Sequence, residues 1–161
     1  MEIVLQPIGV IRSPFEKLED MPIQPAGSHA TVGSLELYPH YQGGLQDLDG
    51  FSHIYVIYHF HKTTDWQERV IPFMDSQERG IFATRAPARP NPIGLSVMQI
   101  LEISGSRVQV RNVDVLDGTP LLDIKPYVPQ FDQVADAKIG WLKGNIDRLD
   151  MTSSDKRFID Q

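Results

Sequence analysis

The chain has 161 residues, of which 41% are hydrophobic and 22% are charged, a composition typical of a globular protein long enough to bury a core. It contains no cysteine, which excludes disulfides and thiolate metal sites, and no run of 18 apolar residues, which excludes a membrane-spanning helix. The formal net charge of −6 excludes a broad basic face for nucleic acid on a single copy of the chain, because phosphate contacts need many Lys and Arg side chains.

Short apolar runs separated by glycine and proline, 12 of each, predict an all-β fold rather than alternating strands and helices. We predict a first strand over residues 3–11 and a second over residues 31–38, with a Pro/Gly-rich loop at 22–27 between them. No basic residues precede the first apolar stretch, so it is not expected to be a signal peptide. These features favour a cytoplasmic protein.

The strongest strand is predicted over residues 51–61. Its alternation puts one set of side chains on one face, Ile54, Val56, Tyr58 and Phe60, and another on the opposite face, Tyr55, Ile57, His59 and His61. Both faces are largely apolar, so we expect a central strand covered on both sides. The charged segment 63–79 is predicted to leave the sheet.

Further strands are predicted over 80–84, 93–103, 107–115 and 121–124, with a tight turn at Gly105. The apolar phase slips within 107–115, which indicates a β-bulge near Arg111 or Asn112. The period then becomes helical, and a C-terminal helix is predicted from Ala135 to Leu149, with Asp132 as its cap. The last ten residues form a polar tail.

Two stretches carry more specialised residues than ordinary loops need. In the first, residues 80–96, closely spaced prolines stiffen the backbone around Arg85, Arg89 and Asn91, as recognition of a carboxylate or phosphate would require. The alternative is a proline-rich corner with solvated arginines. In the second, residues 114–127, an Asp-Gly turn and several charges interrupt an apolar run. Its carboxylates could accept from a ribose hydroxyl, although a hairpin turn followed by an ion pair is the alternative.

Other catalytic and binding motifs are missing. The sequence has no G-x-G-x-x-G after a strand, no P-loop, no H-E-x-x-H and no G-x-S-x-G. His59 and His61 share a strand face, but no third ligand stands near them in sequence, so we predict no metal site. A ligand contact from His61 or Lys62 is the favoured interpretation.

The sequence resembles the TsaA-like (YaeB, TrmO) family of S-adenosylmethionine-dependent tRNA methyltransferases. The matching words are residues 8–14, 51–53, 60–61, 82–96, 117–120 and 123–127, and the resemblance covers about residues 3–130 in order. It implies a single-sheeted β-barrel with short helical excursions over 3–130, followed by the C-terminal helix and tail over 131–161. It also implies a homodimer, S-adenosylmethionine as cofactor, and methylation of N6 of threonylcarbamoyl-adenosine at position 37 of tRNA.

The resemblance implies site residues as well. Those expected at the cofactor are Gln24, Pro25, Ala26, His61, Lys62, Arg85, Leu95, Ser96, Val97, Asp117, Gly118, Thr119, Pro120 and Leu121. Those expected at the substrate are Arg89, Asn91, Asp123, Lys125 and Tyr127. Asp117 is the candidate base or orienting carboxylate.

Longer bacterial members carry a C-terminal RNA-contacting domain, and this chain stops about where that domain would begin. An alternative function is therefore a non-catalytic module that binds S-adenosylmethionine or RNA together with a partner. A small β-barrel hydrolase is disfavoured, because no nucleophile–base pair is recognisable.

Overall fold

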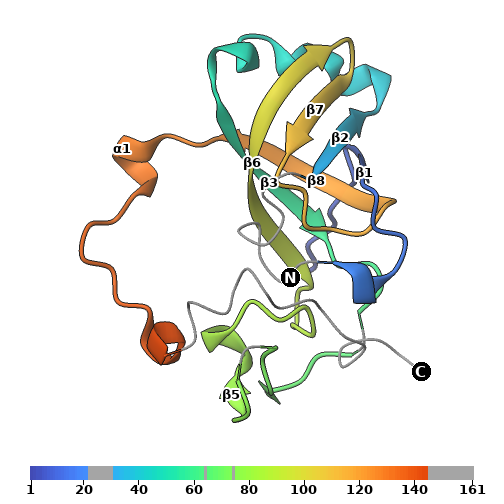
Figure 1. Ribbon diagram of the computed structural model, residues 1–161. Coiled ribbons are helices and arrows are strands. Elements are labelled where there is room, and N and C mark those ends of the chain that lie inside the picture. Colours follow the sequence, from blue (N-terminus) through green and yellow to red (C-terminus); the bar gives the residue numbers. More distant parts are fainter. Residues whose placement is uncertain (22–30, 64, 74, 145–161) are drawn as a thin grey trace.

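Six antiparallel strands close into a barrel in the computed structural model, which describes residues 1–21, 31–63, 65–73 and 75–144 (Figure 1). In order around the barrel the strands are β1 (Gly9–Arg12), β2 (Val32–Leu37), β7 (Arg107–Arg111), β6 (Ile93–Ser104), β3 (His53–His59) and β8 (Thr119–Pro126). The predicted all-β class and single-sheeted barrel are confirmed.

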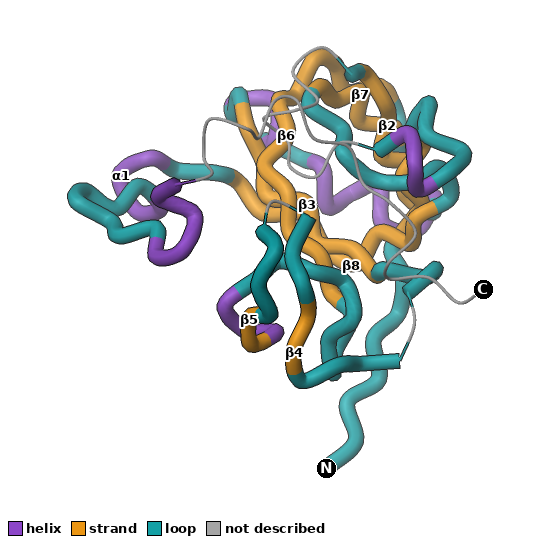
Figure 2. Tube along the Cα trace, turned by 60° about the horizontal axis from the view of Figure 1, so that its bottom comes forward, coloured by secondary structure: helices purple, strands orange, loops and turns teal. Residues whose placement is uncertain are grey.

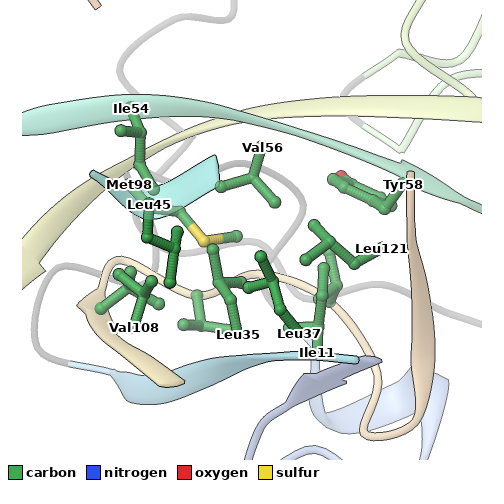
Figure 3. Close-up of a cluster of buried hydrophobic side chains, with 13 residues drawn as sticks. Ile11, Leu35, Leu37, Leu45, Ile54, Val56, Tyr58, Met98, Val108 and Leu121 are labelled. Atoms are coloured by element: carbon green, nitrogen blue, oxygen red, sulfur yellow. The ribbon is translucent and has the colours of Figure 1, made fainter. Parts of the chain in front are cut away.

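The barrel interior is an apolar core (Figure 3). Strand β3 is central, as predicted, because it pairs with β6 on one side and β8 on the other. Its inward side chains Ile54, Val56 and Tyr58 are buried, whereas the opposite face is only half-buried. The prediction that both faces of this strand are covered is therefore wrong, since the closed sheet leaves its outer face open to solvent.

A short ribbon of β4 (Arg69–Val70) and β5 (Arg79–Gly80) lies beyond one end of the barrel in both views (Figure 2). The remaining described elements are the 3-10 helices η1 (Leu18–Asp20), η3 (Pro39–Leu45), η4 (Leu48–Gly50), η5 (Ile81–Ala83) and η6 (Gly140–Gly144), and helix α1 (Pro129–Asp132). Within the described ranges, no helix has the length and apolarity needed to cross a bilayer.

Two predicted strands are shorter or different in the structure. Strand β1 begins at Gly9 because its neighbours β2 and β8 pair with it only from that residue onward. Residues 3–5 are exposed and unpaired with the sheet. The predicted strand 80–84 is wrong beyond Gly80, since residues Ile81–Ala83 form η5.

The predicted bulge near Arg111 or Asn112 is also displaced. Strand β7 ends at Arg111, and Asn112 has a left-handed φ of 69°, which turns the chain out of the sheet. The register shift lies in the neighbouring strand β6, between Ile100 and Glu102. The shift in the apolar alternation within residues 107–115 is therefore caused by the end of β7 at Arg111. The buried Val113 and Val115 that follow belong to a loop.

The predicted helix from Ala135 is not formed over residues 133–139. Asp136 and Gly140 have positive φ values of 58° and 57°, which a right-handed helix cannot contain. Asp132 is the last residue of α1 and does not cap a following helix; its Oδ2 accepts a hydrogen bond from the Val128 N–H at 2.7 Å. The part of the prediction beyond residue 144 lies outside the described residues.

Candidate functional site

One end of the barrel gathers the two segments that the sequence singled out. Because neighbouring strands are antiparallel, β1, β3 and β7 finish at the end where β2, β6 and β8 begin. The proline corner (residues 85–92) leads into β6 there, and the Phe60 N–H donates to the Pro92 carbonyl at 2.8 Å. Residues 112–118, which we name the plug loop, connect β7 to β8 at the same end.

The plug loop closes this end of the barrel from inside. Val113 and Val115 within it are buried against the core. Its two limits are residues with positive φ, Asn112 and Gly118, at which the chain enters and leaves the loop. The Asn112 N–H donates to the Thr31 carbonyl at 2.9 Å, and the Gly118 N–H donates to the Ile11 carbonyl at 3.0 Å. The loop is thus tied to both adjoining strands of the barrel.

A chain of buried polar groups links the plug loop to two strands. The Ser96 hydroxyl of β6 donates to Asp114 Oδ1 at 2.7 Å, and the Tyr58 hydroxyl of β3 lies 3.0 Å from Ser96 Oγ. All three residues are buried, with at most 9% of any of them exposed. Sequence separations of 18 and 38 residues are bridged by these two hydrogen bonds.

Burial gives Asp114 unusual acid–base properties. Desolvation raises the pKa of the Asp114 carboxyl to about 7, and the hydrogen bond from Ser96 and the charge of Arg85 oppose that shift. Desolvation also raises the pKa of Tyr58 above its ordinary value, so the phenol stays protonated. A carboxyl group that titrates near neutral pH inside a closed barrel is a candidate functional group.

The proline corner is built around Arg89. Its Nη1 donates to three backbone carbonyls, those of Ile81 at 3.2 Å, Thr84 at 2.8 Å and Ala86 at 3.3 Å. Buried Ala86 and Ala88 pack against Val70 and Ile81 in a second small core. Arg89 therefore stabilises the corner through Nη1. A predicted substrate contact would have to be made by the other nitrogens of the same guanidinium.

Arg85 differs from Arg89 because it is exposed at the surface of the corner. Its charge acts on Asp114 and Tyr58 inside the barrel end and on Tyr55 on the outer face of β3. The electrostatic influence of Arg85 therefore reaches both the barrel end and the outer face of β3. An exposed guanidinium on a proline-stiffened frame is well placed to bind a carboxylate or phosphate.

Asp117 lies at the rim of the same end. Its Oδ1 accepts from the Ser13 N–H at 3.1 Å, and its Oδ2 pairs with Arg12 Nη1 at 3.4 Å. Arg12 also pairs with Glu36 at 3.2 Å, and the Glu36 hydrogen bond followed by the Asp117 charge raises the pKa of Arg12. The Asp117 side chain keeps 37% of its surface exposed, so it is oriented but still accessible.

His59 is the last residue of β3 at this end, and His61 follows the strand. Burial, and then the charge of Lys62, lower the pKa of His61, so its ring is neutral at neutral pH. Lys62 is exposed. Across the described ranges of the chain, no three His, Cys, Asp or Glu side chains gather as a metal site would need.

The other predicted site residues fall in different places. Thr119 and Leu121 are buried in the barrel, and the Leu121 carbonyl accepts from the Ile8 N–H at 2.8 Å, so we expect them to support a site from the core. Leu95 lies on the outer face of β6, where 53% of its surface is exposed. Outward-facing Val97 is on the same face. Gln24, Pro25 and Ala26 lie outside the described residues.

Strand β8 carries two of the predicted substrate residues, Asp123 and Lys125, away from the plug loop, and Tyr127 follows the strand. Tyr127 lies just beyond the opposite end of β8, where its N–H donates to the His53 carbonyl at 3.0 Å, and its ring packs edge-on against Tyr55 at 5.5 Å. Asp123 and Lys125 form an exposed ion pair at 2.8 Å between the two ends. Asp123 also borders a depression of about 380 Å³ at the far end. The structure thus spreads these residues along the strand.

Sequence reasoning did not select Asp114 or Tyr58 as site residues. Asp114 lies within the acidic stretch, but it was not distinguished from Asp117, although it sits between two valines that belong to the core. A carboxylate flanked by apolar residues is the signal that could have indicated burial. Its hydrogen-bond partner Ser96 is among the residues that the resemblance implies at the cofactor.

Residues 10–133 match the family model of the tRNA-methyltransferase O (TrmO) N-terminal domain. The chain belongs to the TrmO family. It is 49% identical over 156 residues to a Pyrococcus abyssi protein named "Probable S-adenosyl-L-methionine-binding protein", covering 97% of this chain and 85% of that protein. It is 35% identical over 144 residues to the Escherichia coli tRNA (adenine(37)-N6)-methyltransferase, covering 83% of this chain and 61% of that enzyme.

The crystal structure of TrmO from Pseudomonas aeruginosa has the same fold, with a TM-score of 0.74 and 40% sequence identity over 88% of this chain and 63% of that chain. The family resemblance drawn from the sequence is thereby confirmed. The present TrmO-family chain spans about three fifths of the length of the Escherichia coli and Pseudomonas proteins.

Proposed function

We propose that this protein binds S-adenosylmethionine at the plug-loop end of the barrel and transfers its methyl group to N6 of threonylcarbamoyl-adenosine at position 37 of tRNA. Membership of the TrmO family across residues 10–133 carries the proposal. The family includes a tRNA (adenine(37)-N6)-methyltransferase and a protein named for S-adenosylmethionine binding. The meeting of the proline corner and the plug loop at one end supports it in this chain.

The residues at this end fit the cofactor. Exposed Arg85 can make paired hydrogen bonds to its carboxylate, and exposed Lys62, which follows β3 at the same end of the barrel, adds a second positive charge. Asp117, held by Arg12 and Ser13, can accept from a ribose hydroxyl.

When bound, S-adenosylmethionine would supply a methyl carbon to N6, with the electron pair of the broken carbon–sulfur bond staying on sulfur and the N6 proton passing to a base, for which Asp117 is the candidate. The protein's part in such a displacement is mainly positioning and exclusion of water. We assign Asp117 to orient the N6–H or a hydroxyl, because its ion pair with Arg12 fixes the carboxylate. Arg89 and Asn91 remain candidates for the substrate side of the corner.

Replacement of Arg85 by lysine is expected to weaken S-adenosylmethionine binding more than tenfold, which is about 1.4 kcal/mol, since lysine cannot form the planar bidentate contact. Calorimetric titration measures this. The matched control is Arg107→Lys, an exposed arginine at the opposite end of β7, which should bind as the unmodified chain does. Unchanged affinity of the Arg85 variant for both the cofactor and tRNA would remove Arg85 from the site.

A methylation assay on tRNA with and without the threonylcarbamoyl group then tests the reaction. Methyl incorporation only into the modified tRNA is the expected result. Cofactor binding without transfer to either tRNA would favour the second candidate, a non-catalytic module that binds S-adenosylmethionine. The net charge of −6 is the observation that favours this alternative, because one copy offers tRNA little positive charge.

We also propose that the protein is a homodimer. The outer face of β6 exposes Ile93 (38%) and Leu95 (53%), and Phe131 of α1 is 82% exposed on a segment that stands away from the barrel (Figure 1). We assign these exposed apolar side chains to the dimer surface, because contiguous exposed apolar patches mark interaction sites. Light scattering should give twice the chain mass, and Leu95→Asp should return it to one chain mass; a monomeric unmodified protein would contradict the proposal.

A further inference from the structure

The side chains of Tyr58, Ser96 and Asp114 form a hydrogen-bonded chain inside the barrel. It is a polar cluster beside the apolar core, and it joins β3, β6 and the plug loop through two hydrogen bonds of 3.0 and 2.7 Å. Buried polar groups specify one arrangement when every member has a partner. Among the described residues, no buried side-chain nitrogen or oxygen lacks one.

The direction of this chain depends on the proton of Asp114. A serine hydroxyl can donate one hydrogen bond, and an ionised Asp114 can only accept. Ser96 therefore donates to the ionised Asp114, and the Tyr58 hydroxyl must then donate to Ser96 Oγ. A protonated Asp114 can itself donate, which permits the reverse direction. The ionised form therefore specifies one arrangement of the three groups, and its hydrogen bond from Ser96 is charge-assisted and stronger.

Within the part of the chain that the structure describes, Asp114 interacts with Tyr58, Ser96 and Arg85. Tyr58 approaches from β3 and stays protonated, Ser96 approaches from β6, and Arg85 acts from the proline corner. Arg85 is the permanently charged member of this set, and its positive charge favours the ionised carboxylate. Asp114 precedes the Asp117–Gly118 turn by three residues, so what fixes Asp114 also fixes the start of that turn.

We propose that Asp114 is a positioning residue, which in its ionised form locks the plug loop onto β6 and so holds the Asp117–Gly118 turn in the geometry that binds S-adenosylmethionine. This rests on the proposed function. Asp114 acts through Ser96 and the loop backbone, because the carboxyl group itself is buried and cannot reach a bound molecule outside the core.

The test compares S-adenosylmethionine affinity of the unmodified chain, Asp114→Asn and Asp49→Asn at pH 6 and pH 8.5, measured by calorimetry. These pH values lie on either side of the Asp114 pKa of about 7. Asp49 is exposed before β3 at the opposite end, so its variant repeats the charge change without the network. Titration of the ligand's own amine affects all three proteins equally and cancels in the comparison.

For each protein we compare the ratio of its S-adenosylmethionine affinity at pH 8.5 to that at pH 6. This ratio is expected to be at least threefold larger for the unmodified chain and for Asp49→Asn than for Asp114→Asn. Asp114→Asn should match the unmodified chain within twofold at pH 6. Parallel affinities of Asp114→Asn and the unmodified chain at both pH values would overturn the positioning role alone. Absence of binding by the unmodified chain at either pH would overturn the proposed function, and this inference with it.

A second variant separates positioning from folding. Ser96→Ala removes the donor to Asp114 and should reproduce the loss of affinity at pH 8.5, while circular dichroism shows the native barrel. A folded Ser96→Ala protein that keeps the full pH-dependent affinity would show that the network does not position the loop.

Discussion

The unmodified protein is expected to lose on the order of 4 kcal/mol of unfolding free energy as the pH rises from 4 to 7, because of Asp114. Replacement of Asp114 by asparagine is expected to abolish this dependence on pH. The pKa of Asp114 is about 7 in the folded protein, against an ordinary value of 3.8. Between these values the folded chain keeps the proton and the unfolded chain has lost it. Raising the pH through this window therefore favours unfolding, and above pH 7 the contribution is constant.

Urea unfolding at pH 4.5 and pH 7.5 measures this effect. The difference in unfolding free energy between Asp114→Asn and the unmodified protein should increase in favour of the variant as the pH rises. Asp49→Asn provides the control, because an exposed carboxylate of η4 lies far from the buried network. Equal pH dependence in all three proteins would contradict a buried, neutral-titrating Asp114.

A buried ionisable group that costs stability at neutral pH needs a compensating role. An apolar or amide side chain at this position would avoid the desolvation cost. In other proteins, replacing buried charged groups by neutral side chains of similar volume is often neutral or stabilising. Loss of cofactor affinity together with a gain in stability in the Asp114→Asn protein would be the pattern of a functional site. A gain in stability with full affinity would leave the carboxylate unexplained.

Replacement of Gly94 by alanine is expected to destabilise the barrel by about 3 kcal/mol, the upper part of the range for overpacked cores. Gly94 of β6 pairs with Tyr58 of β3, and an added Cβ would lie within 2.8 Å of three atoms of the Tyr58 ring. Neither partner can retreat easily, because β3 is hydrogen-bonded on both sides and the Tyr58 hydroxyl is bonded to Ser96.

Gly80→Ala is the matched control for this experiment. Gly80 has a negative φ of −58°, and an added Cβ there meets no atom within 4 Å. Denaturant unfolding should therefore show little change for Gly80→Ala and a large loss for Gly94→Ala. A Gly94→Ala protein as stable as the Gly80 variant would mean that Tyr58 can move aside, and the rigidity inferred for the buried network would then be wrong.

Local pattern predicted most of the sheet. Period-two alternation located β3, and the stretches around β2, β6 and β8 were found for the same reason, since strand residues alternate between core and solvent. Strand ends were less predictable. Residues 3–5 are as apolar as a strand, but β1 starts at Gly9, because pairing depends on how far its neighbours extend.

The C-terminal helix failed for a related reason. Apolar spacing between Ala135 and Leu142 is helical, yet Asp136 and Gly140 take left-handed conformations. The segment returns to η5, where Trp141 Nε1 donates to the Ala83 carbonyl at 2.8 Å. A long-range contact of this kind overrides a weak local helical preference.

By itself the sequence determined the all-β class, the central strand, the two specialised segments and the family, because these depend on local alternation and on long contiguous words. Only the tertiary structure decided which residues of those segments act together. Closure of the barrel brought Asp114 to Ser96 and Tyr58. Folding of the proline corner turned Arg89 toward its own backbone carbonyls and left Arg85 exposed. The physical reason is that burial and hydrogen bonding across 18 or 38 residues depend on how strands pair, which no local pattern encodes.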